Sequence, residues 1–236
     1  MAYYEQPTMT PVINAPEEER AAFLVRVYQH LGLAVAAFIV FETVLFMSGV
    51  AKAMYEFFAR SGGAAWLILL GGFMVAQWFA SNSVNKLDNP GAQYAGLFGT
   101  AAAQSFIFAP FLYYVFNVNE GGSGDVWAAA AVTGIMFAAL TVVAFVTRRD
   151  LSFLRPIVMW GFIAAMGLIV VSVLFGMQLG LLFSVAMVAL SGAAILYQTQ
   201  DIVRRYPAWA HVGAAVALFG SLMTMFWYVL RIFSNR

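Results

Sequence analysis

The stretch PIVMWGFIAAMGLIVVSVLF, residues 156–175, has twenty residues and no charged side chain. An α-helix rises about 1.5 Å per residue, so a helix of this length measures about 30 Å, the thickness of the hydrocarbon layer of a bilayer. Water is absent from that layer, and a helix satisfies its own backbone hydrogen bonds there. These residues therefore predict a helix that crosses a membrane.

Six further stretches share this apolar character over about twenty residues each. They lie near residues 31–51, 64–80, 94–116, 126–146, 179–199 and 212–233. The chain of 236 residues is 63% hydrophobic and 10% charged, whereas soluble domains carry about 25% charged residues. The predicted fold class is an all-α membrane protein. A seven-transmembrane-helix bundle is expected over residues 21–236, behind a flexible cytoplasmic tail at residues 1–20.

The orientation of the bundle follows from its basic residues, which gather in cytoplasmic loops. An N-in arrangement places eight of the twelve basic residues inside. These eight are Arg20, Arg26, Lys86, Arg148, Arg149, Arg155, Arg204 and Arg205. We therefore predict a multi-pass protein of a bacterial inner (plasma) membrane, with the lipid bilayer as its first partner. The C-terminus then lies outside, or inside if residues 212–233 re-enter the membrane.

Several classes of function are excluded by composition. The chain has no cysteine, which excludes disulfides, thiolate nucleophiles and cysteine zinc sites. His30 and His211 lie at different spans and form no local zinc motif. A formal net charge of +1 gives no electrostatic basis for binding nucleic acid. We expect no enzyme activity, no catalytic residue, no cofactor and no metal site.

Glu42 is the most informative single residue, because it lies inside the first predicted span. A carboxylate at the centre of a spanning helix costs about 2.5–3.5 kcal/mol, so an ionisable residue there suggests a function. Alternatively, Glu42 is protonated and hydrogen-bonded, or faces the headgroups. Gln77 and Gln104 of the second and third spans are its expected polar neighbours.

Polar residues also recur on one face of the sixth and of the seventh span. Gln198 and Asp201 are three residues apart, and Ser221, Thr224 and Tyr228 follow a helical spacing. The two faces could meet as a polar seam, or their side chains could simply bond across helices for about 0.6 kcal/mol each. Asp201 has a further interpretation, a surface ion pair with the arginines three and four residues later.

Three stretches carry a resemblance to a known family. Residues 144–155 read AFVTRRDLSFLR, residues 192–203 read GAAILYQTQDIV, and residues 23–28 read FLVRVY. They resemble the Bax inhibitor-1 family over nearly the whole chain, and most closely its bacterial branch, which modulates the membrane protease FtsH. The resemblance implies a bundle of Bax inhibitor-1 type and a regulatory protein that binds FtsH.

One departure from the family bears on the alternative function. Members that act as pH-sensitive calcium leaks carry two aspartates that share a proton, and the resemblance places these positions at Gln198 and Ser221. Neither side chain titrates, so the acid-gated mechanism is not expected here. The alternative is a leak for Ca²⁺, another cation or H⁺, with Glu42 and the polar seam along its path.

Overall fold

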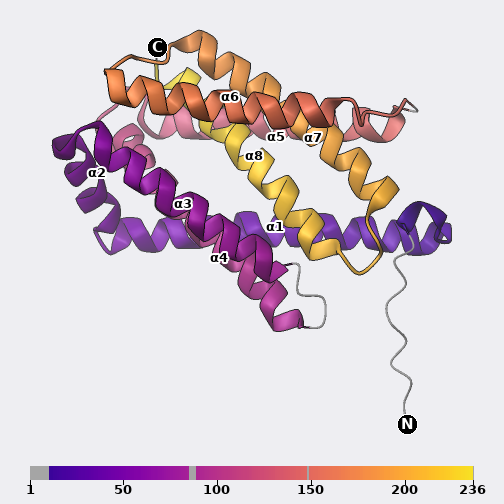
Figure 1. The fold of residues 1–236 in the computed structure, drawn as a ribbon. Coiled ribbons are helices and arrows are strands. Elements are labelled where there is room, and N and C mark those ends of the chain that lie inside the picture. Colours follow the sequence, from indigo (N-terminus) through magenta and orange to yellow (C-terminus); the bar gives the residue numbers. More distant parts are fainter. Residues whose placement is uncertain (1–10, 85–88, 148, 236) are drawn as a thin grey trace.

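The computed structural model describes residues 11–84, 89–147 and 149–235. Within these residues it contains eight α-helices and one short 3-10 helix, η1 (Val12–Asn14). Seven of the α-helices are long and apolar enough to cross a membrane, which confirms the predicted all-α, seven-span fold. The helices, labelled in Figure 1, are α1 (Glu17–Met47), α2 (Val50–Ser61), α3 (Gly63–Val84), α4 (Pro90–Asn117), α5 (Gly122–Val146), α6 (Leu154–Phe175), α7 (Leu181–Arg205) and α8 (His211–Phe233).

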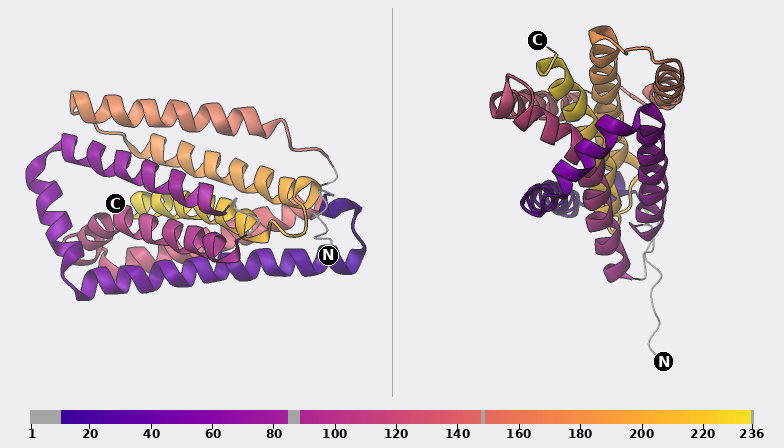
Figure 2. Two further views of the ribbon diagram at one scale, coloured as in Figure 1. Left: turned by 60° about the horizontal axis from the view of Figure 1, so that its bottom comes forward. Right: turned by 90° about the vertical axis from the view of Figure 1, so that its left-hand side faces the viewer.

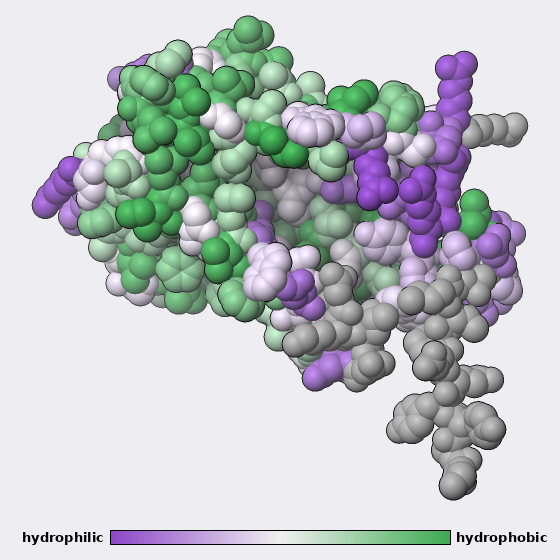
Figure 3. Space-filling model, viewed as in Figure 1, coloured by the Kyte–Doolittle hydropathy of each residue, from purple (hydrophilic) through white to green (hydrophobic). Residues whose placement is uncertain are grey.

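The long helices run back and forth along one general direction, and their connections gather at the two ends of the molecule (Figure 2). Figure 3 shows hydrophilic residues at these ends and a broad hydrophobic band between them. α8 is an unbroken helix of 23 residues, and it finishes at the end opposite the start of α1 (Figure 1). The last helix therefore has the form of a full span.

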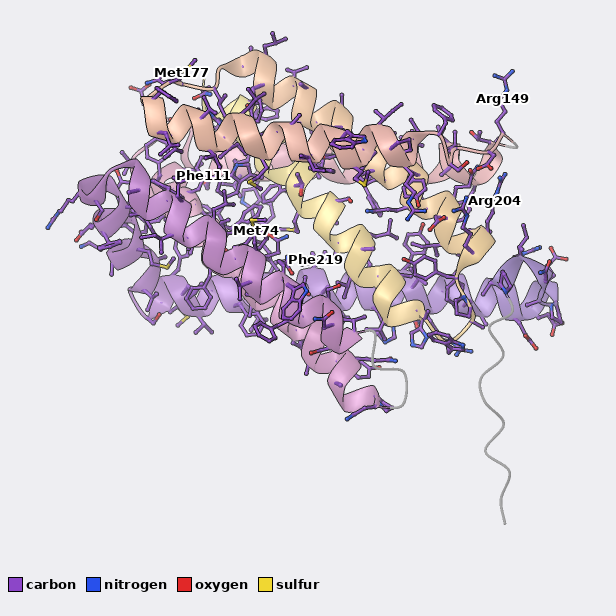
Figure 4. All side chains as sticks on the ribbon, viewed as in Figure 1. Met74, Phe111, Arg149, Met177, Arg204 and Phe219 are labelled. Atoms are coloured by element: carbon purple, nitrogen blue, oxygen red, sulfur yellow. The ribbon has the colours of Figure 1, made fainter. Side chains whose placement is uncertain are left out.

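α8 occupies the centre of the bundle and supplies much of its core. It packs against α1, α4, α5 and α7, and its Phe219 is fully buried (Figure 4). Ala214 and Ala215 are fully buried as well, and such small residues let neighbouring helices approach closely. α6 lies at the edge, where it packs against α7 and α3.

The first span differs most from its prediction. Expected over residues 31–51, it ends at Met47, because the chain turns at Ser48 and Gly49. Gly49 has a φ of 78°, a conformation that a residue without a side chain adopts at little cost. The helix also starts earlier than the expected span, at Glu17, and is 31 residues long.

α2 was expected to be a loop and is a short amphipathic helix. Ala51 on one face is fully buried, and α2 packs with this face against α4. The opposite face carries Lys52, Glu56 and Arg60, with ion-pair distances of 3.9 and 4.0 Å to the glutamate. Twelve residues with charges at every fourth position cannot span a bilayer, and length and apolar character alone do not predict such a helix.

The chain is already anchored at the start of the described residues. Val12 is fully buried, and its backbone N–H donates to the carbonyl oxygen of Tyr206 at 2.9 Å. Pro11 forms an isolated bridge with Pro207. Pro11 and Val12 thus lie against the loop between α7 and α8, and α1 begins at Glu17. The packed helical bundle therefore includes residues before residue 20. The rest of the expected tail, residues 1–10, lies outside the described residues.

Candidate functional site

The polar faces of α7 and α8 meet at the two positions where the resemblance places the family's aspartates. The hydroxyl of Ser221 donates to Oε1 of Gln198 at 2.8 Å. Ser221 is buried, and the bond joins two residues that are 23 positions apart in the chain. A hydroxyl and an amide carry no titratable proton near neutral pH. This pair holds α7 against α8 without sensing pH.

A cavity of about 860 Å³ is lined by Thr224 and Gln104, whereas Gln198 and Ser221 are not part of its lining. Thr224 lies three residues beyond Ser221 on α8, and its hydroxyl donates to the carbonyl oxygen of Gly220 at 2.8 Å. Gln104 is only 5% exposed. The walls of the cavity come from α3, α4, α6, α7 and α8 and from the loop between α6 and α7, and they are mainly apolar. Of the predicted seam residues, Thr224 and Gln104 therefore line the cavity, and Gln198 and Ser221 bond to each other outside its lining.

Glu42 lies on α1 and is not part of the cavity lining. It is 7% exposed, and neither of its carboxyl oxygens has a hydrogen-bond partner among the described residues. One turn earlier, the carbonyl oxygen of Phe38 accepts a bond of 3.3 Å from the hydroxyl of Ser105 in α4. A buried polar group without a partner is costly, so packing alone does not account for a carboxyl group at this position.

Glu42 forms no hydrogen bond with either of its two expected polar neighbours. Gln104 lines the cavity and makes no hydrogen bond to Glu42, whose oxygens have no described partner. Gln77 is half-buried on α3, and it lies outside the cavity lining. The helices that pack closely against α1 are α2, α4 and α8. α1 and α3 are therefore not packed neighbours. The spacing of residues within one helix does not show which helices lie side by side.

Asp201 belongs to an ion-pair cluster at the end of α7 and not to the seam. Its carboxylate lies 3.1 Å from Nε of Arg205, the expected pairing four residues along a helix. Arg204 reaches Asp150 in the loop between α5 and α6, at 3.5 Å. Hydrogen bonds from the backbone and side chain of Ser152, reinforced by the charge of Arg204, hold the pKa of Asp150 below its ordinary value.

Gln200 holds the same loop and was not among the predicted site residues. It is 6% exposed, and its Oε1 accepts from the backbone N–H of Leu151 at 2.6 Å. Its Nε2 donates to the carbonyl oxygens of Arg149 at 2.8 Å and Thr147 at 3.4 Å. An amide provides both donors and an acceptor. The Gln200 side chain therefore fixes the backbone of the loop between α5 and α6, at Thr147, Arg149 and Leu151, through three hydrogen bonds. The only sequence signal was its position in the YQTQD run.

We name the polar surface at this end the basic end surface, and it comprises Arg149, Asp150, Asp201, Arg204 and Arg205. Arg149 and Arg204 project from the same end of the molecule (Figure 4). Figure 3 shows hydrophilic residues gathered there, beside the start of α1. Because Gln200 fixes the loop and Tyr206 anchors the segment at Val12, this surface has a defined shape that a partner could recognise.

His30 and His211 come together although they lie far apart in the sequence. Their ring centroids are 4.8 Å apart, and Nε2 of His30 lies 3.0 Å from the hydroxyl of Tyr94. These residues join α1, α4 and α8 at one end of the bundle. The pair supplies two nitrogen ligands, fewer than the three or four protein ligands that zinc sites use, and no group of three or more potential metal ligands occurs among the described residues.

Known proteins similar to this chain support the resemblance seen in its motifs. An uncharacterized protein of Pseudomonas aeruginosa is 31% identical over 155 residues, which is 63% of this chain and 66% of that protein. The modulator of FtsH protease YccA of Escherichia coli K12 is 30% identical over 146 residues, 58% of this chain and 66% of that protein. An uncharacterized protein of Neisseria meningitidis serogroup A is 27% identical over 188 residues, 77% of this chain and 79% of that protein.

The family assignment covers more of the chain than any of these relatives does. A second Escherichia coli relative, 30% identical over 146 residues, bears the name inner membrane protein YccA, and seven spanning helices fit a multi-pass protein of that membrane. The model of the family described as inhibitor of apoptosis-promoting Bax1 matches residues 20–236. With this match over nearly the whole chain, and with seven helices in the described residues that can cross a membrane, the chain belongs to the Bax inhibitor-1 family.

Proposed function

We propose that this protein is a regulatory protein of the inner membrane that binds the protease FtsH and restrains it. The observation that carries the proposal is its 30% identity to a relative named as a modulator of FtsH. That alignment spans 66% of the relative's length. The chain also offers a defined polar surface at one end of the bundle, the basic end surface, which suits a binding partner of an enzyme.

The basic end surface and the N-terminal segment are the proposed contact. Eight of the twelve basic residues favour an N-in orientation, which puts both features in the cytoplasm. The chain is anchored at Val12 by the bond to Tyr206, the residue after Arg205 of the basic end surface. Residues 1–10 precede this anchored point in the sequence, and we propose them as the handle that the protease binds.

Deletion of residues 2–10 is expected to reduce recovery of FtsH to background when the chain is purified from native membranes. The deletion stops short of Val12 and leaves its bond to Tyr206, so the bundle keeps its fold. The measurement is the amount of FtsH that co-purifies in a mild detergent, scored per mole of chain.

The matched control is the double substitution Lys52→Ala and Arg60→Ala on α2, which lies at the other end of the bundle (Figure 1). Both side chains are more than half exposed, so the fold should tolerate the change and FtsH recovery should equal that of the unaltered chain. Recovery of no FtsH with the intact chain would remove the proposal.

A leak for Ca²⁺, another cation or H⁺ is the second candidate function. It is favoured by the buried, unpartnered carboxyl group of Glu42 and by the cavity that reaches Gln104 and Thr224. The neutral bond between Ser221 and Gln198 leaves no carboxyl pair to gate such a leak with acid.

Liposomes with an internal calcium dye test the leak directly. If the chain conducts, Glu42→Gln should lower the flux, because it removes the ionisable group from α1 while keeping its size. Ser221→Ala is the control for the seam and should leave the pH profile unaltered. A flux that neither Glu42→Gln nor pH changes would eliminate this second function and leave the FtsH proposal untouched.

A further inference from the structure

The large cavity has part of its wall on α3 and α6, two helices whose outward faces carry exposed apolar side chains. α3 and α6 touch near one end, where a Cβ atom placed on Gly63 would lie 2.7 Å from Cγ1 of Val173. From that contact the two helices diverge, with α8 visible between them (Figure 1). Leu70 and Phe73 of α3 and Phe162 of α6 line the cavity on these two helices. Figure 3 looks onto the same side of the molecule, where both rims are hydrophobic.

One end of the cavity carries a single positive charge. Arg231 lines it at the last turn of α8, and one guanidinium nitrogen donates to the carbonyl oxygen of Leu179 at 2.7 Å. No carboxylate in the described part of the chain lies within ion-pair distance of Arg231. A guanidinium has five N–H donors, so Arg231 retains donors for an anion.

The cavity wall also holds a polar group that the chain itself does not satisfy. Gln104 is 5% exposed, lines the cavity, and forms no hydrogen bond with another described residue. The amide atoms of Gln104 are not among the fully buried polar atoms that lack a partner, so they face the open space of the cavity. There they can donate to or accept from a bound molecule or water.

We propose that the cavity binds an anionic phospholipid of the surrounding membrane, with an acyl chain between α3 and α6 and the acidic headgroup on Arg231. A volume of about 860 Å³ falls within the range of about 300–1,000 Å³ that is usual for ligand sites. The apolar walls suit a hydrocarbon chain, which would enter from the bilayer between α3 and α6. The single cation at one end selects a lipid with a negative headgroup over a zwitterionic one.

Tryptophan quenching by brominated lipids tests this site, because Trp227 lies in the cavity wall. Its ring packs against Phe108 and Phe111, with centroid distances of 4.8 and 4.7 Å. In a variant whose other five tryptophans are phenylalanine, Trp227 reports contact with bromine on an acyl chain. The variant is placed in phosphatidylcholine vesicles that contain either brominated phosphatidylglycerol or brominated phosphatidylcholine.

Phosphatidylglycerol should quench Trp227 at about one fifth of the mole fraction that phosphatidylcholine needs, which is the selectivity expected from one basic side chain near a headgroup. Arg231→Gln should abolish this difference and leave quenching by the neutral lipid unchanged. Ala165 is buried and lines the cavity. Ala165→Phe puts a ring into that space and should protect Trp227 from both lipids.

A second single-tryptophan variant serves as the control. Trp160 of α6 is 64% exposed and is not part of the cavity lining, so both lipids should quench it equally, with or without Arg231. Equal quenching of Trp227 by the two lipids would overturn the headgroup assignment, and absence of quenching would overturn the site.

The unaltered protein provides a second readout that does not depend on the tryptophan substitutions. Purified from native membranes and examined by mass spectrometry, it should retain phosphatidylglycerol or another anionic phospholipid, and Arg231→Gln should lose it. Retention of the same lipids by both proteins would contradict the role of Arg231.

Discussion

Gly96→Ala should destabilise the bundle by about 2–3 kcal/mol, at the upper end of what one additional carbon atom does in a packed interior. A Cβ atom on Gly96 would lie 2.6 Å from the carbonyl oxygen of Ala80 and 2.9 Å from the backbone nitrogen of Val84. Both are backbone atoms of α3, so relief requires a shift of the whole helix. The measurement is the free energy of unfolding in detergent micelles, followed by circular dichroism.

Gly99→Ala is the matched control, since Gly99 lies one turn away on the same helix. There the nearest atom to a new Cβ would be Cβ of Ala80 at 3.8 Å, an ordinary contact. Alanine is a better helix former than glycine by about 1 kcal/mol, so this variant should be as stable as the parent or slightly more stable. Equal destabilisation by both substitutions would show that α3 and α4 do not pack as described.

Gln200→Ala should release the loop between α5 and α6, with an increase of about tenfold or more in tryptic cleavage after Arg149. The substitution removes three hydrogen bonds to the backbone of that loop. Each is worth about 1 kcal/mol net, and unsatisfied backbone groups add to the loss. A tenfold rise corresponds to a change of only about 1.4 kcal/mol in the free energy of local opening.

Limited proteolysis in detergent micelles contains its own control. Cleavage after Arg60, in α2 at the opposite end of the bundle, should proceed at the parental rate, which separates local release of the loop from general unfolding. Gln200→Glu keeps an acceptor for Leu151 but loses both donors, so it should fall between the parent and the alanine variant. Unchanged cleavage after Arg149 in Gln200→Ala would mean that other contacts hold the loop.

The number of spans could be predicted from the sequence because each spanning helix needs about twenty mainly apolar residues. Long apolar runs meet this requirement, and the predicted bounds of α6 agree with the structure to within two residues. α2 was not predicted, because a short interfacial helix is recognised by the periodicity of its apolar residues over a few turns and not by the length of an apolar run. The end of α1 was misplaced because the apolar run continues through the turn at Gly49 into α2.

The candidate site could be predicted in part, wherever helical periodicity and the family motifs acted together. The contact between Gln198 and Ser221 follows from two motif positions on adjacent helices. The pairing of His30 with His211, and the separation of Glu42 from Gln77, depend on the order in which helices surround α8. That order is a property of tertiary packing, which spacing within one helix does not encode.

The central claim, restraint of FtsH, is tested most directly by proteolysis in a reconstituted system. FtsH and a membrane substrate are placed in vesicles of inner-membrane lipids with or without this chain, and the rate of substrate degradation is measured. We expect slower degradation when the intact chain is present and the full rate when residues 2–10 are deleted. An identical rate with and without the correctly inserted intact chain would contradict it.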